Sequence, residues 1–183
     1  MAYILNIETS TDVCSVAIAK NENLLALAET QESFQHATQL THLITTCLLD
    51  TKLKMKDLAA VAVSAGPGSY TALRVGTSTA KGIAYALNLP LIAVDTLRAL
   101  AHAAAREVQR DILYCPMIDA RRMEVYTALY DLKNMTVTET QAVIVDKDTF
   151  SSYFADDNQI VFIGDGAEKC RSVIHSPSAI FHP

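Results

Sequence analysis

The sequence of 183 residues has little positive charge, because 15 Lys and Arg residues stand against 20 Asp and Glu residues, and the formal net charge is −5. The shortage is most pronounced in the first fifty residues, where Lys20 is the only Lys or Arg. Proteins that bind nucleic acid by themselves usually carry a basic surface. The composition therefore argues against a general nucleic-acid binder, and a role on RNA would have to work through a partner protein.

The sequence also lacks a long apolar run. Its longest uncharged stretches, 58–73 and 82–94, are interrupted by Gly, Pro or Asn and do not reach the length of a membrane-spanning helix. The N-terminus has no basic residues before its apolar segment, which argues against a signal peptide. The four cysteines are far apart, with no C-x-x-C pair, and this spacing favours reduced thiols. We therefore expect a cytoplasmic protein with no membrane segment.

Hydrophobic periodicity in the first part of the chain predicts an α/β fold. Short apolar segments separated by polar turns favour strands, whereas apolar residues that recur every three or four positions favour helices. The opening three strands indicate a hairpin pair rather than a simple alternation of strand and helix. The expected elements are strands at 3–8, 14–19, 24–28, 58–64 and 91–94 and helices at about 35–49, 70–87 and 96–108.

The pattern then begins again, which predicts two tandem subdomains, 1–108 and 109–183. In the second copy we expect strands at 112–119, 124–130, 137–145 and 160–164, with a short helix at 147–154. Only eleven residues follow Ser172, too few for a last strand and a long helix. The second subdomain is therefore expected to be incomplete.

A glycine-containing loop, Gly66-Pro67-Gly68-Ser69, lies between an expected strand and an expected helix. Backbone amides at such a junction can point at an anion. The spacing matches neither the dinucleotide-binding fingerprint nor the P-loop, which needs a Gly-Lys-Ser/Thr sequence. The loop is thus either an anion cradle or only a tight turn.

A second candidate segment is the acidic, hydroxyl-rich turn after the first strand, Glu8 to Asp12. It could hold nucleotide phosphate through backbone amides or a metal through its acids, or it could be a hairpin turn that satisfies its own hydrogen bonds. Asp119 occupies the corresponding place in the second copy of the pattern. The candidate nucleotide-binding residues are Glu8, Ser10, Thr11, Gly66, Gly68 and Asp119.

The histidines form no metal site that the spacing can identify. His36 and His42 lie six residues apart, near opposite faces of the expected helix, so they cannot bind one metal together. The other three histidines have no nearby ligand partners in the sequence. There is no zinc signature and no Ser-His-Asp set, so we expect neither a metal nor catalytic residues.

Small residues recur along the expected helix 70–87 at Gly76, Ala80 and Ala84. Such a stripe allows another helix to approach closely, either from a partner subunit or from within this protein. With the amphipathic helix at 35–49, it indicates a helical face available to another subunit. Packing on the protein's own sheet is the alternative.

Three sequence segments together resemble one family. They are ILNIETST at 4–11, SAGPGSYTALRVG at 64–76, and IDAR at 118–121 followed by EVY at 124–126. The chain resembles over nearly its whole length the bacterial TsaB family, also called YeaZ, of tRNA threonylcarbamoyladenosine biosynthesis proteins. This resemblance implies two tandem subdomains of the actin/Hsp70/sugar-kinase (ASKHA) fold, an α/β architecture with mixed sheets flanked by helices.

The resemblance also implies a non-catalytic partner subunit. Members of the family act with a TsaD-like subunit and a TsaE-like ATPase that together transfer a threonylcarbamoyl group to tRNA adenosine next to the anticodon. TsaD-like sequences carry a His-x-x-x-His metal pair after the strand equivalent to 91–94, and the segment 94–100 here has no histidine. The chain alone is expected to need no cofactor. ATP or ADP is expected in the complex, and the chain is expected to contact tRNA only as part of that complex.

The resemblance implies that the helices at about 35–49 and 70–87 form the contact with the TsaD-like subunit. It also implies that the chain forms a homodimer through the same face when that subunit is absent. Ala72 stands where the family commonly has Gly. The alternatives are an ATPase or phosphotransferase of the same fold and, less favoured, a glycoprotease-like peptidase. The candidate interface residues are Gln39, His42, Leu43, Gly76, Thr79, Ala80 and Ile83.

Overall fold

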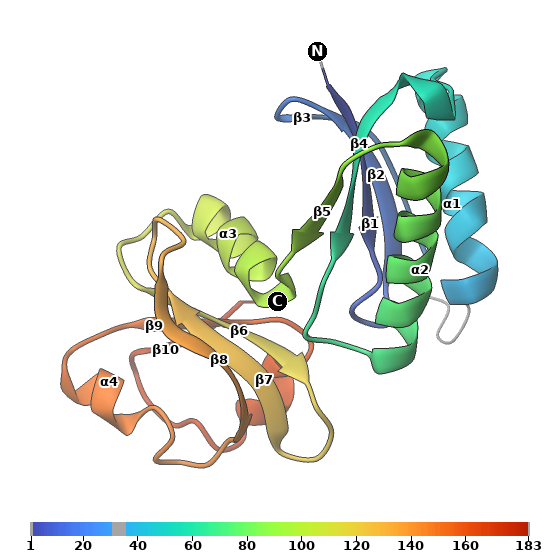
Figure 1. Ribbon diagram of the computed structural model, residues 1–183. Coiled ribbons are helices and arrows are strands. Elements are labelled where there is room, and N and C mark those ends of the chain that lie inside the picture. Colours follow the sequence, from blue (N-terminus) through green and yellow to red (C-terminus); the bar gives the residue numbers. More distant parts are fainter. Residues whose placement is uncertain (1, 31–35, 183) are drawn as a thin grey trace. The chain divides into compact units, whose positions relative to one another are not determined.

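The computed structural model describes residues 2–30 and 36–182 (Figure 1). The chain forms two compact units, Met1–Asp95 and Thr96–Pro183, each with its own sheet. No helix in the described ranges is long and apolar enough to cross a membrane.

The first unit contains a five-stranded sheet in the order β3-β2-β1-β4-β5. Strands β1, β2 and β3 pair antiparallel, whereas β4 and β5 run parallel to β1. Buried residues alternate with partly buried ones along β1 and β2, so that one face of each strand is buried. The strands are β1 (Tyr3–Glu8), β2 (Cys14–Lys20), β3 (Asn23–Thr30), β4 (Leu58–Ser64) and β5 (Leu91–Val94).

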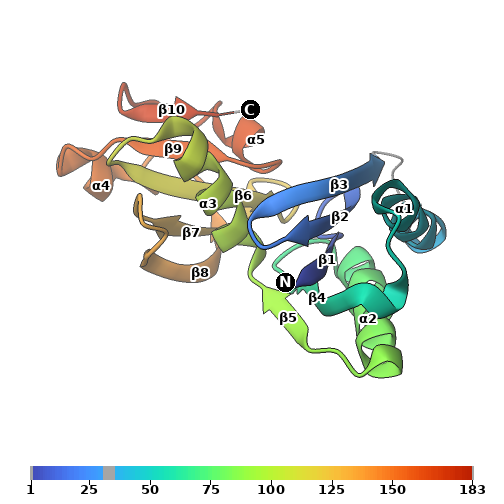
Figure 2. The same cartoon turned by 90° about the horizontal axis from the view of Figure 1, so that it is seen from above.

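Two long helices, α1 (His36–Thr51) and α2 (Tyr70–Leu87), pack side by side on one face of this sheet (Figures 1 and 2). Residue 35, where the sequence analysis begins the first helix, lies outside the described residues. Helix α2 ends at Asn88, whose left-handed backbone lets its amide donate to the carbonyls of Ala84 and Tyr85. A single-turn 3-10 helix, η1 (Met55–Asp57), leads into β4.

The second unit has the same strand arrangement, in the order β10-β9-β6-β7-β8. Its sheet has helices on both faces: α3 packs on β6, β7 and β9, and α5 lies against the other face of β6. The elements are α3 (Thr96–Val108), β6 (Leu113–Asp119), β7 (Glu124–Tyr130), β8 (Thr136–Ile144), α4 (Ser151–Ala155), β9 (Ile160–Ile163), α5 (Ala167–Cys170) and β10 (Ala179–Phe181).

The matching strand orders confirm the predicted repeat, with β6 to β10 corresponding to β1 to β5. One expectation was wrong, because the second copy does contain its last strand. Three residues after Ser178 are enough for β10 to pair in parallel with β9. The short α5 stands where the first unit has the long α2, so the second copy is reduced mainly in its helices.

The boundary between the two compact units falls between residues 95 and 96, whereas the sequence pattern places the boundary between 108 and 109. The difference is helix α3, which follows β5 in the sequence but buries its alanine face against the second sheet. As repeating subdomains, 1–108 and 109–183 stay a prediction.

Candidate functional site

The two candidate loops of the first unit meet at the carboxyl ends of β1 and β4. These strands are adjacent and parallel, so the turn after Glu8 and the loop after Ser64 emerge at the same edge of the sheet. The Ser69 amide donates a 2.7 Å hydrogen bond to the Ser10 carbonyl. A Cβ atom at Gly68 would overlap that carbonyl, so this close approach requires glycine.

Hydrogen bonds within the turn hold its polar groups. Glu8 Oε1 accepts a 2.6 Å bond from the Ser10 amide, and Thr11 Oγ1 accepts one from Val13. His36 Nε2 lies 3.0 Å from the Thr11 carbonyl. The nearby Gly66 has a φ of +100°, which favours glycine. The Ser10 and Ser69 amides therefore already have partners inside the protein.

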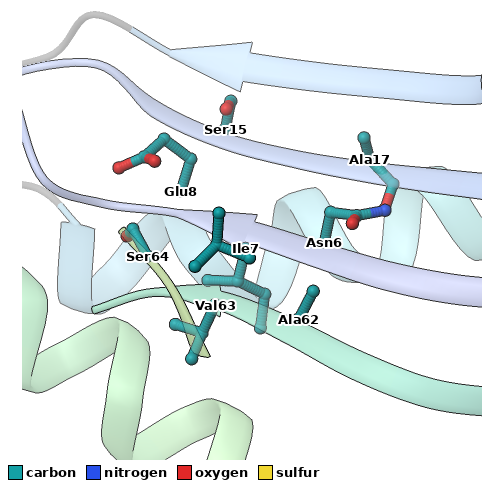
Figure 3. Close-up of a pocket in the computed structure, with 9 residues that line it drawn as sticks. Asn6, Ile7, Glu8, Ser15, Ala17, Ala62, Val63 and Ser64 are labelled. Atoms are coloured by element: carbon teal, nitrogen blue, oxygen red, sulfur yellow. The ribbon is translucent and has the colours of Figure 1, made fainter. Parts of the chain in front are cut away.

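A hollow of about 150 Å³ lies beside this edge, on the face of the sheet away from α1 and α2. Figure 3 shows Glu8, Asn6, Ser15 and Ser64 around it. The Ser64 hydroxyl accepts a 3.3 Å bond from the Thr9 amide. Sequence reasoning identified Glu8 but missed the other three residues. Asn6 and Glu8 stand two positions apart in an otherwise apolar strand, and that spacing could have placed them on one face.

Asp119 lies in the second unit, in an ion pair with Lys169 at 2.7 Å. Partial burial by itself raises the pKa of Asp119, but hydrogen bonds from Lys169 and the Arg121 amide, with the Lys169 charge, hold it below its usual value. Asp165 Oδ1 accepts a bond from the Asp119 amide. Asp119 is thus a hydrogen-bonded structural carboxylate in this structure.

Asp119 is not the counterpart of Glu8 that the repeated pattern predicts, because strand register separates the two. Glu8 pairs with Ser15, on the face away from α1 and α2. Asp119 pairs with Val125 and reaches Lys169 of α5, on the face that corresponds to the α1 and α2 side. A shift of one residue along a strand reverses the face, so these carboxylates are not equivalent.

The small-residue stripe of α2 faces the interior of its own unit. Gly76 and Ala80 are buried, and a Cβ atom at Gly76 would overlap Thr9 Oγ1. Ala84 belongs to the same buried set. These positions pack on the sheet, which is the alternative that the sequence left open.

The remaining candidate interface residues lie along the paired α1 and α2. His42 is exposed, whereas Gln39 and Thr79 are partly buried. Leu43 and Ile83 pack partly against the core and remain partly accessible. These five residues are therefore accessible in part or in full, whereas Gly76 and Ala80 are buried.

Metal-ligand side chains are scattered through the described part of the chain, where no group of three or more His, Cys, Asp or Glu side chains lies close enough together to hold a metal ion. The four cysteines are buried as free thiols. Burial raises the pKa of the Cys115 thiol to about 12, despite a hydrogen bond with Thr127. Burial also raises the pKa of the other three thiols, which disfavours the nucleophilic thiolate form.

Comparisons with a family model and with curated proteins point to the same group of proteins. The family model for TsaD, tRNA N6-adenosine threonylcarbamoyltransferase, matches residues 28–173. A protein of Buchnera aphidicola named tRNA threonylcarbamoyladenosine biosynthesis protein TsaB is 38% identical over 128 residues, 69% of this chain and 57% of the relative. The chain spans less than two thirds of the length of the curated TsaB relatives that it matches first.

Solved structures agree with the fold. YeaZ from Pseudomonas aeruginosa superposes with a TM-score of 0.82 at 26% identity, covering 98% of this chain and 84% of that one. Component A of (R)-2-hydroxyglutaryl-CoA dehydratase from Acidaminococcus fermentans superposes at 0.52 with 11% identity over all of this chain and 92% of its own, which bears on the fold alone. The predicted ASKHA-type α/β fold is therefore confirmed. The chain belongs to the TsaB (YeaZ) family of tRNA threonylcarbamoyladenosine biosynthesis proteins, within the wider family that the TsaD model describes.

Proposed function

We propose that this chain is a non-catalytic partner subunit in the transfer of a threonylcarbamoyl group to tRNA adenosine next to the anticodon. The observation that carries the proposal is its similarity to proteins named for threonylcarbamoyladenosine biosynthesis. The proposed partners are a TsaD-like subunit and a TsaE-like ATPase, with ATP or ADP bound in the assembled complex. The net charge of −5 supports contact with tRNA through the complex rather than by this chain alone.

The proposed contact surface is the exposed part of α1 and α2, around Gln39, His42, Leu43, Thr79 and Ile83. Two helices packed side by side offer a ridge against which two helices of a partner can pack. The same surface would form a homodimer when the partner is absent. We place this assembly in the cytoplasm, where the tRNA substrate is found.

Sedimentation of the chain mixed with the TsaD-like protein of the same organism tests the proposal. Thr79→Arg adds a long charged side chain to the surface without entering the core, so we expect it to abolish the heterodimer. Thr140→Arg is the matched control, because Thr140 is an exposed residue on β8 of the second unit. Pairing that survives Thr79→Arg would contradict the mapped surface. A native chain that pairs with no TsaD-like protein would contradict the partner role itself.

A further inference from the structure

We draw no further inference here: the strongest candidate, the face of the first sheet opposite α1 and α2, carries no proposal because nothing in the described part of the structure shows what covers it.

Discussion

Gly76 of α2 lies directly against the buried hydroxyl of Thr9, with no room for a Cβ atom between them. We expect Gly76→Ala to lower the free energy of unfolding by about 1–3 kcal/mol, because the helix must move away from the sheet. Urea denaturation measures the change. Gly82→Ala is the matched control, since a Cβ there meets nothing within 4 Å, and it should stabilise the helix by roughly 0.5–1 kcal/mol.

The same pair gives a coupling test. Thr9 Oγ1 has no hydrogen-bond partner among the described residues. Thr9→Ala removes the group that a Cβ at Gly76 would overlap, so Gly76→Ala should cost less in that background. A double-mutant cycle should give a coupling energy of about 1 kcal/mol or more, and strict additivity would contradict the contact.

The ion pair between Lys169 and Asp119 should contribute modestly to stability. Asp119 is 46% exposed, so we expect Asp119→Asn to cost no more than about 1 kcal/mol at pH 7. The pKa of Asp119 is lower in the folded state, so its contribution is full above the ordinary value of 3.8 and disappears as the pH falls through the folded pKa. Urea denaturation at pH 7 and pH 3 measures it, with exposed Asp156→Asn as the control.

The four cysteines should be unreactive in the native protein. All are buried, and burial raises the pKa of each thiol, to about 12 for Cys115. At pH 8 roughly one Cys115 in 10⁴ would be a thiolate, even before access is considered. A thiol reagent should label none of the four before unfolding and all of them in denaturant. Rapid labelling of the folded chain would contradict this prediction.

The remaining test concerns the candidate nucleotide-binding residues. The Ser10 and Ser69 amides already donate within the protein, and Asp119 is paired with Lys169. We therefore expect the purified chain to hydrolyse no ATP above background. Glu8→Ala should leave that background rate unchanged. Turnover that Glu8→Ala abolishes would instead favour the ATPase alternative. Asp12→Ala, an exposed acid of the same turn, is the control variant.

The sequence predicts the strand and helix order well because most elements have clear periodicity. It fails for β10, because a three-residue strand is defined by its pairing with β9 and has no periodicity of its own. It also cannot decide which way the α2 stripe faces. A row of small residues suits a partner helix and an internal sheet equally, and the contact between Gly76 and Thr9, 67 positions apart in the sequence, decides between them.

The candidate site is predicted only in part, for a related reason. Glu8 and the Gly66–Gly68 loop are visible as local motifs, and their meeting follows from parallel pairing of β1 and β4. Alignment of the ends of β1 and β6 pairs Asp119 with Glu8, but the end of a strand does not determine which face a side chain occupies. The register with the neighbouring strand does, through the partners Ser15 and Val125.

Helix α3 belongs to one repeat by sequence and to the other by packing, and this has a consequence for synthesis on the ribosome. All strands of the first unit have been made by residue 95, so that unit can fold while the rest is translated. Helix α3 is made next, but its sheet begins only with β6. For that interval its alanine stripe has no sheet of its own on which to pack, and a pause in translation there would prolong its exposure to chaperones.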